Sequence, residues 1–231
     1  IGSGSGTMLE QSVMSLLKEL VSAGKLDAQS LAVLIGDRLN DPWELHNWFY
    51  QWYRGLGIET ITGKPFELSE CPFTQQEIQR ARERNEIILC VPKGVSRQQL
   101  GELFRIRSWA FSDPLIGETT EQADFWFRTS ATMKPDRIRS TGISIAHSID
   151  NEGWVHFTLE RYLVFLAAMK AQHGQYPDRE YWIWITKGRY DRSGMLMAGI
   201  DRLGHFNAHG WMPQFEAGFL GARHGELPEK R

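Results

Sequence analysis

The chain has 231 residues, of which 42% are hydrophobic and 23% are charged, as in an ordinary folded globular protein. Its apolar runs are far shorter than the roughly 20 residues that a membrane-spanning helix requires. Composition therefore excludes both a disordered and a membrane-spanning chain. The net charge is −2, divided into −5 over residues 1–127 and +3 over residues 128–231, which gives the C-terminal part a slight preference for anionic partners.

The N-terminal part of the chain is predicted to be helical. Residues 1–7 have the composition of a cloning remnant and are excluded from the fold prediction. Apolar residues recur at helical spacing over residues 8–23, and Asp27 can cap a second helix that extends to Leu39.

A third helix is predicted over residues 42–55. Asp41 can serve as the N-cap, Pro42 suits the first helical position, and Glu44 can reach back to the N-cap amide. We therefore expect a helical unit over residues 8–56, followed by a Gly- and Pro-containing connection over residues 57–73.

The next segment mixes helices with a buried strand. A capping box that begins at Thr74 predicts a helix to about residue 85, and a second box at Ser96 opens another helix. Between them, residues 87–91 form a continuous apolar run that suits a strand buried on both faces. This helix–strand–helix order indicates layered α and β structure.

The C-terminal part contains mostly strand patterns around one helix. Apolar and polar residues alternate over 125–133 and 140–149, and both segments are predicted to be strands. A helix is predicted over 158–174, because apolar residues follow one stripe and Gly174 ends it. The remaining predicted strands cover residues 154–157, 181–186, 195–200 and 205–211, the last two joined by a hairpin loop over 201–204.

Together these elements predict an α+β protein. An N-terminal helical unit packs on a mixed domain, residues 74–231, whose C-terminal sheet is largely antiparallel.

The three strands between Tyr181 and Trp211 concentrate aromatic and basic residues. Aromatic rings beside guanidinium groups can stack on planar ligands and hold anions. Trp182 and Trp184 share one side of their strand, and the pattern does not decide whether that side is core. The candidate ligand-binding residues are Trp182, Trp184, Lys187, Arg189 and Arg192.

Six of the seven histidines lie at or after His147, which makes them candidates for general acid–base chemistry. On a strand, His205 and His209 share a face but stand roughly 13 Å apart, too far to bind one metal ion by themselves. No metal site is predicted. The candidate catalytic residues are His147, His156, His205 and His209, with Glu160 or Asp201 as the carboxylate.

Other motifs argue against cofactors and redox chemistry. The sequence has no phosphate-binding glycine loop that opens a helix after a strand, so no nucleotide cofactor is predicted. Cys71 and Cys90 lack metal-binding or redox spacing and are expected to be buried thiols in a reducing, cytoplasmic environment. Residues 96–104 resemble the first helix of a helix-turn-helix domain, although no second helix follows.

Three functions remain open. The leading hypothesis is a non-enzymatic binding or interaction protein that uses the aromatic and basic face of the C-terminal sheet. Its partner would be an anionic ligand, a nucleic acid or a protein. The alternative is a hydrolase-like enzyme, nucleolytic or metal-assisted, that uses the clustered histidines. The third is a DNA-associated regulator that uses the helix at residues 96–104.

Overall fold

The computed structural model describes residues 41–190, 194–201 and 203–229. The helices predicted over 8–23 and from Asp27 to Leu39 lie outside these residues, as does Arg192. The described helices are α3 (Pro42–Leu56), α4 (Ile58–Thr62), α5 (Gln75–Glu83), α6 (Arg97–Leu103), α7 (Gly142–Glu152) and α8 (Leu159–His173), with a short 3-10 turn η1 (Trp109–Phe111).

Two sheets complete the α+β fold. The first has the strand order β1 (Glu86–Val91), β2 (Phe125–Ser130), β9 (His224–Glu226) and β4 (Val155–His156), with all neighbours antiparallel. The second has the order β3 (Arg137–Ile138), β8 (Leu220–Ala222), β5 (Trp182–Tyr190), β6 (Gly194–Ile200) and β7 (Phe206–Trp211). Only the β5–β8 pair is parallel among these described strands, so the prediction of a largely antiparallel C-terminal sheet is confirmed.

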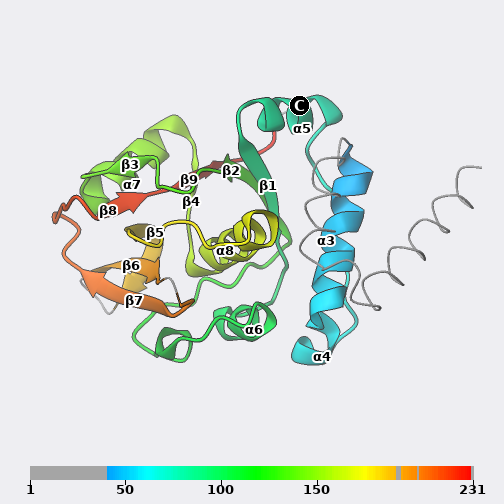
Figure 1. Ribbon diagram of the computed structural model, residues 1–231, viewed down its shortest axis with the longest axis horizontal. Helices are drawn as coiled ribbons and strands as arrows, with labels where there is room; N and C mark the ends of the chain where they lie inside the picture. Colours follow the sequence, from blue (N-terminus) through cyan, green and yellow to red (C-terminus); the bar gives the residue numbers. More distant parts are fainter. Residues whose placement is uncertain (1–40, 191–193, 202, 230–231) are drawn as a thin grey trace, which may run out of the picture.

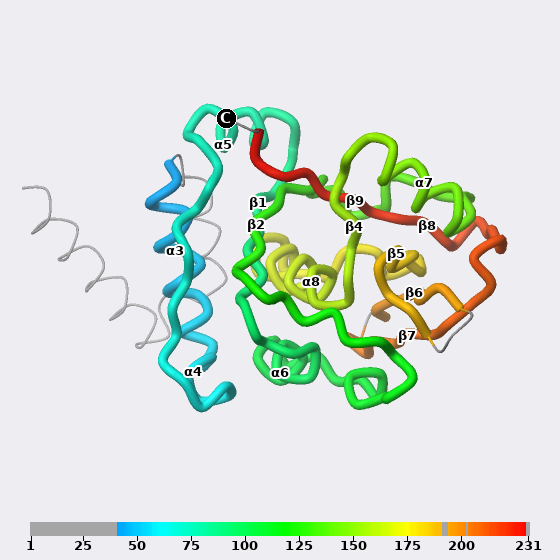
Figure 2. Tube along the Cα trace, turned by 180° about the vertical axis from the view of Figure 1, so that it is seen from behind, coloured from blue at the N-terminus to red at the C-terminus, as the bar shows by residue number. Residues whose placement is uncertain are grey.

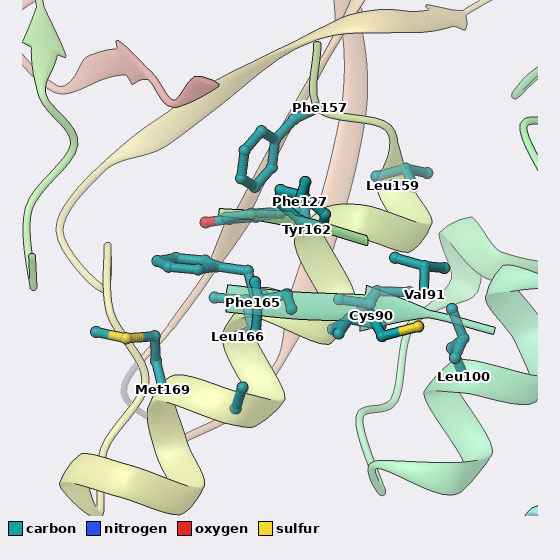
Figure 3. Close-up of a cluster of buried hydrophobic side chains, with 14 of the residues drawn as sticks. Cys90, Val91, Leu100, Phe127, Phe157, Leu159, Tyr162, Phe165, Leu166 and Met169 are labelled. Atoms are coloured by element: carbon teal, nitrogen blue, oxygen red, sulfur yellow. The ribbon is translucent and has the colours of Figure 1, made fainter. Parts of the chain in front are cut away.

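Helix α8 lies between the two sheets, and α3 and α4 stand along one side of the molecule (Figures 1 and 2). The α8 sequence is apolar on nearly every side, which is the pattern of an internal helix. Its ring side chains Tyr162 and Phe165 pack with Phe157, which in turn contacts Phe127 from β2 (Figure 3). Strand β1 is buried on both faces as predicted, and it lies beside α8.

The predicted caps are present where the helices begin. The Asp41 side chain accepts a hydrogen bond from the Glu44 amide, and both capping boxes close, at Thr74 and at Ser96. Side chains of α3 join the same core as α8, and the Tyr53 hydroxyl donates to the carbonyl oxygen of Cys90 at 2.7 Å. Local capping signals therefore predicted these helix starts correctly.

The strand predicted over residues 140–149 is wrong, because this segment forms α7. The Thr141 hydroxyl accepts a hydrogen bond from the Ser144 amide, and Gly153 ends the helix in a left-handed conformation. Ile145 and Ile149 are the buried residues, and their spacing of four fits a helix. The alternating pattern that suggested a strand included Ile143, which is exposed.

A buried ion pair holds the junction between the two sheets. Arg223 is the single residue between β8 and β9, and its guanidinium donates to both carboxylate oxygens of Asp178, at 2.7 and 2.8 Å. Both side chains have no exposed surface. The guanidinium also donates to the Thr132 carbonyl oxygen and lies over the Phe165 ring, while the Tyr162 hydroxyl donates to Asp178. These partners come from three segments, which are α8, the loop after α8 and the segment after β2.

We expect Arg223→Met to lower the free energy of unfolding by about 3–5 kcal/mol, because it leaves the Asp178 carboxylate buried without its partner. Urea denaturation measures this change. The control is Arg80→Ala, which removes the exposed ion pair between Arg80 and Glu229 and should cost less than about 1 kcal/mol. Equal effects of the two substitutions would contradict the role of the buried pair.

Candidate functional site

The outer face of the second sheet, which points away from α8, carries most of the predicted binding residues. Strand register places Trp184, Met197 and His209 in one row across β5, β6 and β7. The next row contains Met195 and Trp211. The opposite face, with Ile183, Ile185, Leu196, Ala198, Phe206 and Ala208, belongs to the core around α8.

Helix α7 covers one part of this outer face. Ile145 and Ile149 pack with Trp184, which has no exposed surface and donates its indole N–H to the Ser140 carbonyl oxygen at 3.1 Å. The approach at Gly142 is close, because a Cβ atom there would lie 2.5 Å from the Met195 sulfur. At Trp184, β5 is therefore buried on both of its faces.

The part of the outer face that α7 leaves open is aromatic. The His209 ring lies between those of Trp109 and Trp182, with centroid distances of 5.4 and 5.5 Å. Trp211 follows two residues along the same strand and contacts Phe215, with centroids 5.9 Å apart. Trp109 and Trp211 are 48% and 45% exposed, far more than a core indole. We call this set the aromatic face: Trp109, Trp182, Met197, His209, Trp211 and Phe215.

A glycine in β6 gives the aromatic face its flat shape. Gly199 lies opposite Asn207 in the ladder, and a Cβ atom at Gly199 would lie 3.3 Å from the Trp182 indole. Because the strand has no side chain here, Trp182 can lie across it and reach His209.

Basic residues lie at two ends of the aromatic face. Arg189 is exposed and opposite Met195, which is in turn opposite Trp211, so these three form one row. Arg107 is exposed and forms a bridge with His205 at the start of β7. The predicted residue Lys187 is also exposed, at the far end of β5 from Trp182.

The structure separates the four candidate histidines into different settings. His209 belongs to the aromatic face, whereas His205 contacts Asp201 across the hairpin loop at 3.0 Å. His147 is exposed on α7. The hydrogen bond from the His205 amide is the main cause of the lowered pKa of Asp201. The contact with the His205 ring adds to this effect.

His156 makes the most ordered set of contacts among them. Its Nδ1 lies 2.8 Å from the Thr186 hydroxyl, and its Nε2 lies 2.8 Å from a carboxylate oxygen of Asp150. We call Asp150, His156 and Thr186 the relay. The hydrogen bond from His156 lowers the pKa of Asp150, and nearby Lys187 and His147 act in the same direction. Asp150 and Thr186 had no motif around them and were missed in the sequence.

Glu160 lies apart from the candidate histidines. It is fully buried in the first turn of α8, accepts a hydrogen bond from the Thr119 hydroxyl, and has a raised pKa because burial disfavours its charged form. Glu160 is therefore a core residue. The carboxylate that contacts His156 is that of Asp150.

A cavity of about 430 Å³ lies elsewhere, between α3, α5, β1 and the end of α8. Its apolar wall includes Leu45, Trp48, Phe49 and Ile88. Its lining contains none of the predicted site residues that the structure describes.

The helix that resembles part of a helix-turn-helix domain is tied to the body of the protein. Arg97 in α6 is 3% exposed and donates to four carbonyl oxygens of residues 111–117. The following described segment contains only the short turn η1 before β2. Arg97 is therefore a structural residue that orders this loop.

No protein-family model, curated protein sequence or solved structure matches the chain. Within residues 41–190, 194–201 and 203–229, no group of three or more His, Cys, Asp or Glu side chains is arranged to hold a metal ion. None of the helices in these ranges is both long and apolar enough to cross a membrane. The residues themselves are thus the basis for a functional proposal.

We expect Glu160→Gln to flatten the dependence of unfolding free energy on pH. The raised pKa means that the folded state holds this proton more tightly than the unfolded chain, whose value is about 4.3. Stability contributed by the bound proton is complete below the unfolded pKa and is lost as the pH rises through the folded pKa. Urea denaturation at several pH values above about 4 measures this loss, which the variant should not show.

The control for this experiment is Glu102→Gln, which replaces an exposed glutamate on α6 and should keep the wild-type pH dependence. Parallel curves for the wild-type protein and Glu160→Gln would contradict the raised pKa.

Proposed function

We propose that the protein is a binding protein whose aromatic face receives a segment of another protein. The supporting observation is the contiguous set of partly exposed rings and a methionine on a sheet whose other face is buried. Exposed apolar patches of this kind are uncommon on proteins without partners. Trp, Met and Arg are also the residue types enriched at the centres of protein interfaces.

Rigidity of the face favours binding. All but Phe215, which follows β7, stand on the paired strands β5, β6 and β7 or on η1, and the inner side of these strands belongs to the core around α8. Few side chains therefore lose rotamer freedom when a partner binds, which lowers the entropic cost of association.

The charges around the face indicate the partner's chemistry. Arg189 and Arg107 flank it, so the matching segment carries apolar anchors with acidic residues near its ends. A single-stranded nucleic acid would also use stacked rings, but it needs basic groups along its whole path. The centre of this face has His209 and Met197 in place of such a basic track.

A peptide-display selection on the immobilised protein tests this proposal. We expect enrichment of sequences with aromatic or large aliphatic residues next to Asp or Glu. Trp211→Ala should weaken binding of a selected peptide by at least about 10-fold, since loss of a central interface tryptophan costs about 2 kcal/mol or more. Fluorescence anisotropy measures the Kd of each variant.

The matched control is Trp43→Ala, which removes a 67% exposed tryptophan from α3, outside the aromatic face. It should leave the Kd unchanged. The proposal fails if no peptide is enriched, if Trp43→Ala and Trp211→Ala weaken binding equally, or if a labelled oligonucleotide binds the face more tightly than the selected peptides.

A further inference from the structure

Thr186 of the relay lies in the middle of β5, where the strand departs from regular pairing. Ile185 pairs with Leu196 and Arg189 pairs with the adjacent Met195, so residues 186–188 form a bulge. A Cβ atom at Gly188 would lie 2.8 Å from Ile185 and Leu196, so this residue packs inward. The bulge leaves Thr186 half-buried and Lys187 exposed. Bulges often redirect a side chain toward a site in this way.

The hydrogen bonds of the relay have a direction. An ionised Asp150 carboxylate only accepts hydrogen bonds, so its partner, Nε2 of His156, carries the proton when the imidazole is neutral. Nδ1 is then unprotonated and accepts the hydrogen bond from the Thr186 hydroxyl. A nucleophile, a general base and an orienting carboxylate are hydrogen-bonded in the same order and direction.

The backbone that carries the base is also held in place. His156 is 8% exposed, and its carbonyl oxygen accepts a hydrogen bond from the Arg161 guanidinium at 2.7 Å. Arg161 is itself fixed by Glu121 and lies over the Phe125 ring. Arg161 thus fixes the backbone of His156, while burial and the contacts with Thr186 and Asp150 hold the imidazole, which is the preorganisation that a general base requires.

We propose that Asp150, His156 and Thr186 form a nucleophilic acyl-transfer site that takes small carboxylic esters. The Thr186 Oγ1 attacks the ester carbonyl carbon while its proton moves to Nδ1 of His156. The bond to the leaving alkoxide then breaks, and the alkoxide takes that proton. Water attacks the acyl-threonine in the same manner, with His156 as base, and releases the acid and the free hydroxyl.

The cationic groups around the relay define its electrostatics. Lys187 is exposed on the bulge and lies close enough to Asp150 to lower the pKa of that carboxyl, as does His147 on α7. Esters with a negatively charged leaving group or acid are therefore the preferred substrates.

Covalent labelling of the whole chain with a fluorophosphonate reagent tests the proposal. In this reaction the Thr186 oxygen forms a bond to phosphorus, fluoride leaves, and the proton passes to His156. We expect one adduct by intact mass, located on Thr186 by peptide mapping. Thr186→Val, which keeps the shape but removes the hydroxyl, should lose it, and Thr186→Ser should keep it.

Variants of the two partners separate catalytic from structural effects. His156→Gln should slow labelling by at least about 100-fold, as for loss of a general base. Asp150 is a positioning residue, so Asp150→Asn should slow labelling while Asp150→Glu restores part of the rate. Ser144→Ala on α7 is the hydroxyl control and should label normally. Thermal unfolding of each variant confirms that it is folded.

Absence of an adduct on the folded wild-type protein would overturn the proposal, as would an adduct that persists in Thr186→Val. The aromatic face is not needed for this reaction, so Trp211→Ala should label at the wild-type rate. The labelling experiment can therefore contradict the acyl-transfer proposal without affecting the binding proposal.

Discussion

The ion pair between Arg223 and Asp178 is the interaction on which the arrangement of the two sheets depends. Arg223 is the only residue between β8 of the second sheet and β9 of the first. Its partners come from the loop after α8, the segment after β2 and α8 itself. An unpaired charge at this depth would be costly, so the chain must bring these segments together to fold.

The two candidate sites each include a residue of β5, Trp182 or Thr186, and α7 covers Trp184 between them. Its middle covers Trp184, while its last turn brings Asp150 to His156 and Thr186. The rings that it leaves open form the aromatic face. One helix thus determines which tryptophan is core, which remain exposed, and where a carboxylate meets the buried histidine.

Local signals in the sequence predicted the elements better than the sites. The caps at Asp41, Thr74 and Ser96 and the stripe of α8 depend on neighbouring residues, so they could be recognised directly. The segment 140–149 has apolar residues that satisfy both a two-residue and a four-residue period, and only packing against Trp184 decides between them.

That error also hid the relay. With 140–149 predicted as a strand, nothing connected Asp150 with His156 or Thr186. His156 was found because histidine is rare and chemically informative, whereas an isolated threonine in a strand carries no such signal. Likewise, the ring contacts of Trp109 with His209 join segments 100 residues apart in the chain, which no local pattern can predict.

The division of the outer face by α7 is tested most directly by the solvent exposure of its tryptophans. Fluorine NMR of the protein labelled with 5-fluorotryptophan, with resonances assigned by Trp→Phe variants, reports each indole when a soluble paramagnetic agent is added. Trp109 and Trp211 should broaden strongly, and Trp184, which is 0% exposed, should remain sharp. Broadening of Trp184 to the same extent as Trp211, or protection of Trp211, would contradict the account.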